Sequence, residues 1–185
     1  MTDHDTMLAV RNGDIEKMGM LFEKHHKHLY NFFRLVTRSR EMSEDLVNDV
    51  FYRMLKYRHT YRPDGDFKPW MFAVARNARI EYLRSCDRKA ESLDDIPEPV
   101  SSVPGADKVL EREDDNALVR KALAALPEDK RELLIMSRYN HMKYREIGEA
   151  LGCSEGTVKV RVHRAVKDLA DIFFSLTGDT HHGMH

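Results

Sequence analysis

The chain has 185 residues, 42% of them hydrophobic and 33% charged, and its 30 Lys and Arg nearly balance 31 Asp and Glu for a net charge of −1. This composition excludes collagen-like, mucin-like and broadly disordered chains, and the length predicts one domain or two small ones. The sequence has no apolar run of about 18 residues that could span a membrane, and its start lacks the pattern of a signal peptide. Two distant cysteines, Cys86 and Cys153, suit a reducing compartment. We therefore expect a cytoplasmic protein without membrane insertion.

The N-terminal part of the chain has the apolar spacing of amphipathic helices. Apolar residues three and four positions apart between Ile15 and Val36 predict a first helix, with Asp14 as its N-cap. His25 occupies a place in that apolar stripe. Ser43, followed by two acids, predicts the start of a second helix, because its side chain can cap the helix and the acids suit the positive end of the dipole.

A third predicted helix begins near Phe67, after a turn at Arg62–Asp66. Between Arg53 and Lys89 the sequence holds ten Lys and Arg and four acids, with aromatic residues interleaved among them. Basic side chains suit a phosphate backbone, and aromatic rings can stack on unpaired bases. This pattern favours nucleic-acid binding; the alternative is a solvated basic face above an ordinary aromatic core.

Charge divides the chain into three parts. Residues 1–90 carry 17 Lys and Arg against 13 acids, a net charge of +4, whereas residues 91–118 carry 2 against 9, a net charge of −7. Residues 119–177 return to a net charge of +3. Because the acidic part is also rich in proline, we expect a flexible linker there. The expected parts are a domain at 1–90, an acidic linker at 91–116, a domain at 117–177 and a disordered tail at 178–185.

The C-terminal part contains the most specific local pattern. A helix over 117–126 is expected to stop before Pro127, which can open the next helix. Farther on, Tyr144–Leu151 predicts a short helix, Gly152 a left-handed turn and Ser154 the cap of a second helix, which together form a helix-turn-helix. Its second helix has a mainly cationic outward face, as a DNA-recognition helix needs, although an ordinary helical hairpin is the alternative. The expected fold is therefore all-α, with two small helical domains.

Three blocks in this order resemble the extracytoplasmic-function (ECF) sigma factors of bacterial RNA polymerase. They are SEDLVNDVFYRML, FKPWMFAVARNARIEYLR and LPEDKRELLIMSRYNHMKYREIGEALGCSEGTVKVRVHRAVKDL, and the resemblance extends over about residues 14–169. It implies an alternative sigma factor that directs promoter-specific transcription initiation, without catalysis or a cofactor. The implied partners are core RNA polymerase, through its β′ clamp helices and β flap, promoter DNA, and an anti-sigma factor.

The resemblance also assigns roles to individual residues. The implied contacts with core polymerase are Asp45, Asn48, Asp49 and Arg53. The implied residues for recognition and melting of the −10 element are Arg62, Asp64, Gly65, Asp66, Phe67, Trp70, Arg76, Asn77 and Arg79. The implied contacts with the −35 element are Glu155, Lys159, Val160, Arg161, His163, Arg164 and Lys167. The apolar Val160 favours contact with a thymine methyl group.

Two other functions stay open on the residues. A stand-alone helix-turn-helix regulator with a ligand-sensing N-terminal domain predicts tight promoter binding without polymerase. A metal-dependent enzyme could use His25, His26 and His28, or the histidines of the terminal HHGMH. No set of Cys, His and carboxylate residues has the spacing of metal ligands, so we expect no metal site.

Overall fold

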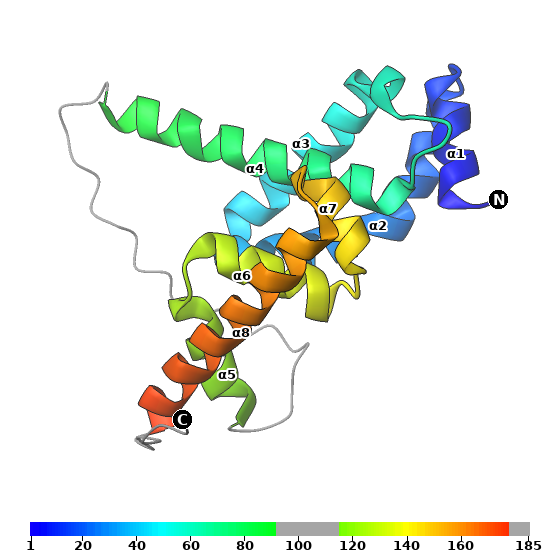
Figure 1. Ribbon diagram of the computed structural model, residues 1–185. Coiled ribbons are helices and arrows are strands. Elements are labelled where there is room, and N and C mark those ends of the chain that lie inside the picture. The colour runs from blue at the N-terminus through cyan, green and yellow to red at the C-terminus, as the bar shows by residue number, and fades with distance from the viewer. Residues whose placement is uncertain (92–114, 178–185) are drawn as a thin grey trace.

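The computed structural model describes residues 1–91 and 115–177, and all of its regular elements are helical (Figure 1). The prediction of an all-α chain is confirmed. Apart from its first and last residues, the expected linker at 91–116 lies outside the described residues, and so does the expected tail at 178–185. The helices are α1 (Asp3–Arg11), α2 (Met18–Thr37), α3 (Arg40–Lys56), α4 (Phe67–Glu91), α5 (Asp115–Ala125), α6 (Glu128–Leu134), α7 (Tyr144–Leu151) and α8 (Glu155–Thr177). Short turns of helix are η1 (Ile15–Lys17), η2 (Arg58–Thr60) and the π-helical η3 (Ile135–Tyr139).

The N-terminal domain, α1–α4, is built around an aromatic core. Helix α2 packs on α3, and α3 packs on α4. Phe32 and Phe72 are buried and meet edge to face, with ring centroids 5.1 Å apart, a geometry that aromatic pairs prefer. Arg38, in the left-handed conformation with φ at 62°, ends α2, and the side chain of Ser39 caps α3 directly afterwards. This tight turn lets the apolar faces of α2 and α3 share one core.

Two predicted helix starts in this domain are wrong. The helix expected from Asp14 begins at Met18, because Ile15–Lys17 forms a 3₁₀ turn in which Ile15 is 51% exposed. Ser43 lies inside α3 instead of capping it: its buried hydroxyl donates to the carbonyl of Ser39, with the oxygens 2.5 Å apart. Ser39 is the actual cap, since its hydroxyl accepts from the backbone N–H of Met42.

Helix α1 was not among the predicted elements. Thr2 and Asp5 cap it reciprocally: the Thr2 hydroxyl accepts from the backbone N–H of Asp5, whose carboxylate accepts from the backbone N–H of Thr2. Met7 and Val10 are fully buried against the rest of the domain. A helix of nine residues shows only two turns of periodicity, so its sequence pattern is weak.

The C-terminal domain, α5–α8, contains the predicted helix-turn-helix. Gly152 ends α7 with φ at 66°, and the hydroxyl of Ser154 accepts from the backbone N–H of Thr157 to cap α8. A Cβ at Gly148 would lie 2.6 Å from the carbonyl oxygen of Cys153, so glycine permits the close approach of α7 to the turn. On the inner face of α8, Val158, Val162 and Ala165 are buried and Leu169 is half-buried. These observations confirm the α7–turn–α8 prediction.

The two domains pack against each other. Helix α7 lies across α4, while α6 and η3 contact α2 (Figure 1). Within the described residues, no helix combines the length and apolar character that crossing a bilayer requires. Both cysteines are free thiols, Cys86 exposed and Cys153 half-buried.

Candidate nucleic-acid interface

The outer face of α8 is open to solvent. Because Val158, Val162 and Ala165 point into the domain, the residues between them point outward. Arg161 differs from the other predicted −35 residues: it is half-buried, with its guanidinium 3.9 Å from the carboxylate of Asp129 on α6. The exposed members of the predicted set are Glu155, Lys159, Val160, His163, Arg164 and Lys167.

The loop at residues 62–66 forms a compact turn before α4. The backbone N–H of Gly65 donates to the carbonyl of Arg62 over 3.1 Å, and the side chains of Arg62 and Asp64 form an exposed ion pair. Asp66 pairs with Arg145 of α7 at 3.1 Å. The loop borders a pocket of about 450 Å³ whose other walls come from both domains, and its lining includes Trp70, Ala73, Arg145 and Glu149.

The aromatic residues beside this loop have different exposures. Phe67 is 5% exposed and packs against the rings of Tyr61 and His25, so it is a core residue in this arrangement. Trp70 is half-buried and meets Tyr61 edge to face, with centroids 5.1 Å apart, while it also lines the pocket. Asn77, farther along α4, is exposed.

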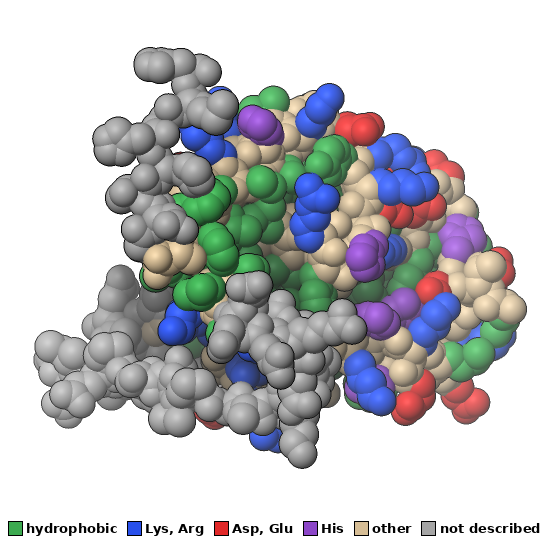
Figure 2. Space-filling model, turned by 90° about the horizontal axis from the view of Figure 1, so that it is seen from below, with side chains coloured by type: hydrophobic (Ala, Val, Ile, Leu, Met, Phe, Trp, Pro, Cys, Tyr) green, Lys and Arg blue, Asp and Glu red, His purple; other side chains and the backbone are tan. Residues whose placement is uncertain are grey.

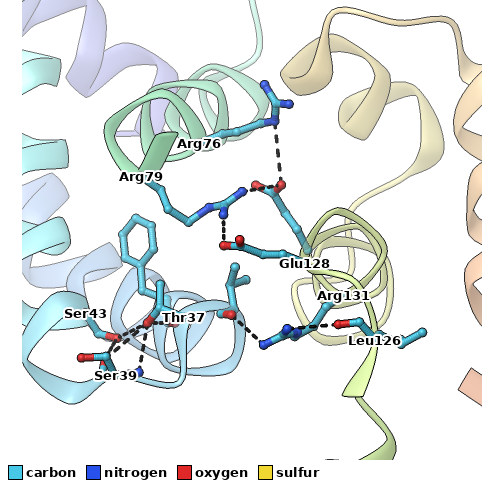
Figure 3. A network of polar contacts seen from close by, with 11 residues as sticks. Thr37, Ser39, Ser43, Arg76, Arg79, Leu126, Glu128 and Arg131 are labelled. Atoms are coloured by element: carbon cyan, nitrogen blue, oxygen red, sulfur yellow. Dashed lines mark hydrogen bonds and ion pairs between the residues drawn. The ribbon is translucent and has the colours of Figure 1, made fainter. Parts of the chain in front are cut away.

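Two arginines of α4 contact carboxylates of the other domain (Figure 3). Arg79 forms ion pairs with Glu128 and Glu132 of α6, the second at 2.9 Å, and Arg76 lies 3.8 Å from Glu132. The side chains of Arg79 and Glu132 are only 6% and 5% exposed. Burial raises the pKa of Glu132, and the charges of Arg79 and Arg76 oppose that shift. The guanidinium groups of Arg76 and Arg79, for which the resemblance implied contacts with the −10 element, therefore lie beside carboxylates of α6.

Further polar contacts join the two domains. Arg131 of α6 donates to the carbonyl of Val36 at the end of α2, and Lys68 of α4 donates to the carbonyl of Asn140, over 3.0 and 2.6 Å. Within the described residues, the buried side-chain polar atoms that lack a hydrogen-bond partner all belong to residues of this domain interface. They are Nε of Arg76, Arg79 and Arg131, Oε1 of Glu132 and Oδ1 of Asn140.

The predicted polymerase-binding residues lie on α3. Asp45 and Asn48 are exposed, whereas Asp49 and Arg53 are half-buried and joined by an ion pair of 2.7 Å. Arg53 also pairs with Glu81 of α4 at 2.7 Å. Burial works against the charge of Arg53, but its bonds to Glu81 and Asp49 raise the pKa of the guanidinium overall. Asp49, Arg53 and Glu81 border an open cavity of about 710 Å³ between α3 and α4.

Hydrophobic side chains gather on part of the face seen in Figure 2, while acidic and basic side chains mix over much of the rest. The C-terminal domain contributes several large exposed apolar residues, which include Val119 on α5 and Val166 and Leu176 on α8. Apolar side chains that gather on one face, as in Figure 2, commonly mark protein contacts, whereas apolar residues exposed singly do not.

Two of the three neighbouring histidines of α2 are packed locally, and the third, His28, is exposed. His25 bonds to Asp3, with Nε2 2.9 Å from the carboxylate, and His26 stacks on Phe22. Among the described residues, no three His, Cys, Asp or Glu side chains form a group that could hold a metal ion. Nothing in this part of the chain therefore favours the metal-dependent alternative.

Sequence comparisons match both domains to sigma factors. Residues 21–89 match the family model for sigma-70 region 2, and residues 116–169 match the model for sigma-70 region 4. The chain is 28% identical over 176 residues to the RNA polymerase sigma factor CarQ of Myxococcus xanthus, covering 92% of this chain and 97% of that protein. It is 30% identical over 165 residues to the ECF RNA polymerase sigma factor RpoE of Cereibacter sphaeroides, covering 88% and 90%. A similar solved structure is the sigma factor RpoE of Bartonella quintana in complex with the anti-sigma factor NepR, with a TM-score of 0.67, 25% identity and coverage of 83% and 94%.

The fold and the two matched regions define a two-domain sigma factor of the sigma-70 class. The chain belongs to the ECF sigma factors. It is an alternative sigma factor that directs transcription initiation by RNA polymerase, as the resemblance implied, and the stand-alone regulator is not favoured.

Some residues at these surfaces escaped the sequence analysis. Glu132 gave one usable signal: it stands three and four positions before Ile135 and Met136, so in a helix it shares their apolar face. Its partner Arg79 lies 53 residues earlier, in the other domain. His4 and Arg145, which both contact the loop at residues 62–66, gave no signal.

Proposed function

We propose that residues 1–90 bind core polymerase and capture the melted −10 element, and that residues 117–177 recognise the −35 element. Residues 91–116 would connect the two and residues 178–185 would form a tail. The observation that carries this proposal is the outer face of α8, which is exposed and mainly cationic, while Val158, Val162 and Ala165 on the opposite face are buried. The protein itself would catalyse no reaction, since the polymerase performs the chemistry, and it would act in the cytoplasm, where polymerase meets the promoter.

At the −35 element, α8 would enter the major groove. Lys159 and Arg164 would donate to base edges or phosphates, and Val160, half-exposed on the same face, would contact a thymine methyl group. Glu155, His163 and Lys167 complete the exposed surface. Arg161 lies beside Asp129 of α6, so it would stabilise the position of α8 and would not contact DNA.

At the −10 element, the protein has to hold a base after it leaves the duplex, and unstacking costs a few kcal/mol. The loop at residues 62–66 and Trp70 would form the surface that holds this base, and Asn77 is exposed beyond them; in the packed form, Arg145 and Glu149 of α7 close the other side of a pocket there. Arg76 and Arg79 would neutralise phosphates. Because α6 holds both guanidiniums and Arg145 closes one wall of the pocket, we propose that the packed arrangement is the free form. The domains would separate when the protein binds polymerase.

The protein contacts are proposed on separate faces. Asp45 and Asn48, together with the Asp49–Arg53 pair, would bind the β′ clamp helices, and the exposed apolar side chains of α5 and α8 would bind the β flap. An anti-sigma factor would cover one or more of these faces. That partner is supported by the relative from Bartonella quintana, whose structure is a complex with the anti-sigma factor NepR.

Run-off transcription tests the function. Core polymerase is incubated with fragmented genomic DNA, with and without this protein, and new transcripts are sequenced. The proposal expects starts that share two spaced upstream elements and require the protein. If the protein instead binds such DNA tightly and specifically without polymerase, and adds no transcript, the stand-alone regulator is correct.

A further inference from the structure

Helix α1 is firmly attached to the N-terminal domain. Its buried residues Met7 and Val10 join the core, and Asp3 binds two side chains of α2. The Asp3 carboxylate lies 2.7 Å from Nζ of Lys24 and 2.9 Å from Nε2 of His25. The position of α1 is therefore fixed by apolar packing, by the Asp3–Lys24 ion pair and by the hydrogen bond between Asp3 and His25.

From this helix, His4 reaches the loop at residues 62–66. Its Nδ1 lies 2.7 Å from the hydroxyl of Tyr61 and 3.1 Å from the carbonyl oxygen of Gly65. The Tyr61 hydroxyl donates to the same carbonyl over 3.2 Å. Burial raises the pKa of Tyr61 to about 12, so this hydroxyl keeps its proton at neutral pH. His4, Tyr61 and Gly65 thus form a closed triangle of polar contacts at the C-terminal end of the loop.

A second remote helix reaches the same loop, but from the other domain. Arg145 of α7 pairs with Asp66, and the two side chains are 62% and 56% exposed. Pairs this exposed contribute about 0–1 kcal/mol. Separation of the domains would break that pair, whereas His4 belongs to the same domain as the loop. The contact from α1 therefore survives in the form that would bind promoter DNA.

The contact point is sensitive to geometry. A Cβ at Gly65 would lie 3.3 Å from the carbonyl of Arg62, so the turn is already tight. Asp64 and Asp66 flank Gly65, and a change in the orientation of its peptide would move both carboxylates. The anchor at Gly65 thereby controls the groups that the loop presents to DNA.

We propose that His4 is a positioning residue for promoter recognition: it holds the loop at residues 62–66 in the shape that selects the −10 element. This inference rests on the proposed role of that loop. His4 itself would touch no base, and its effect would pass through Gly65 and Tyr61.

The test measures selectivity in the assembled holoenzyme. Run-off transcription is compared between the best promoter and templates altered at single −10 or single −35 positions. His4→Ala is expected to reduce −10 discrimination roughly two- to tenfold, as loss of one hydrogen bond implies, and to leave −35 discrimination unchanged. His4→Asn should restore it, because the amide nitrogen of Asn can take the place of Nδ1. Tyr61→Phe keeps the buried ring and should act like His4→Ala.

His28→Ala, which removes an exposed histidine of α2, is the matched control and should match the wild type. Unchanged −10 discrimination in His4→Ala would overturn the inference, and so would an equal loss at both promoter elements with a lower melting temperature. Asp64→Ala and Asp66→Ala separate the two proposals. If they reduce −10 discrimination while His4→Ala does not, the role of the loop stands and that of His4 fails; if neither does, the role of the loop itself fails.

Discussion

The two surfaces proposed for DNA differ in what covers them. The outer face of α8 is open, and its cations lie in solvent, whereas the arginines of α4 are held by carboxylates of α6. Arg79 and Lys159 are both cations on long helices, yet the side chain of Arg79 is only 6% exposed whereas Lys159 is an exposed residue. A charge pattern can therefore indicate a binding surface, but it does not show whether other parts of the chain cover that surface. In the packed form the surface proposed for the −35 element is exposed, whereas Arg79, proposed for the −10 element, is buried against α6.

The largest effect is expected from removal of Glu132, which should expose the arginines of α4. Glu132→Ala leaves Arg79 with one carboxylate fewer in a buried site, and breaking a buried ion pair destabilises by about 3–5 kcal/mol. We expect the domains to separate, which fluorescence transfer between labels on the two domains would measure. The free variant should also bind forked −10 DNA more tightly. Glu44→Ala, which removes an exposed ion-pair partner on α3, is the control. Unchanged transfer would show that this pair does not hold the domains together.

The open surface is tested on α8. Lys159→Ala and Arg164→Ala should each weaken −35 recognition by about 1–3 kcal/mol if the side chain contacts a base. Holoenzyme competition between promoters with intact and altered −35 elements measures this. Lys121→Ala removes an exposed cation of α5 and should leave the preference intact. A normal −35 preference in both α8 variants would mean that another face contacts the DNA.

Asn77 tests the covered region at a residue that α6 leaves exposed. Asn77→Ala should slow open-complex formation on duplex promoter about tenfold, the equivalent of a single lost contact of 1.4 kcal/mol. Permanganate footprinting of the −10 element follows the opening. A template with a pre-melted −10 element should restore the rate. Equal opening of duplex DNA by variant and wild type would contradict the role in melting.

The smallest effect is expected at the edge of the domain interface. Arg145→Ala removes the exposed pair with Asp66, and such pairs contribute about 0–1 kcal/mol. The same fluorescence measurement should show little difference between variant and wild type. A higher salt concentration should make that difference smaller still, because salt screens the exposed pair in the wild type. If Arg145→Ala separates the domains as much as Glu132→Ala does, the exposed Arg145–Asp66 pair contributes as much to domain packing as the buried Arg79–Glu132 pair.

Local chemistry made most of the fold predictable. Gly152 and Ser154 act on their immediate neighbours, so the helix-turn-helix was predicted with its bounds. The start of α3 was misplaced because Ser39 and Ser43 are both good caps, and only the left-handed Arg38 before Ser39 decides between them. Candidate residues on α8 were likewise predictable, since helical periodicity alone sets which of them face outward.

The remaining features depend on contacts between distant segments. Arg79 fits a basic helix face equally well whether DNA or Glu132 neutralises it, and Glu132 belongs to the other domain. Phe67 belongs to an aromatic cluster that includes His25, 42 positions away in the sequence. Helix α1 and His4 were missed because their importance comes from what they touch, not from their own pattern.

The unpartnered polar atoms of the domain interface affect how the domains can part. Arg76, Arg79 and Glu132 are charged groups whose buried atoms lack some of their hydrogen bonds in the packed form. When the domains part, these groups regain water, and their hydration offsets part of the contact energy that is lost. An interface of well-packed hydrocarbon would instead expose apolar surface to water on every opening, with a risk of aggregation. The polar part of this interface is therefore compatible with the proposed separation of the domains.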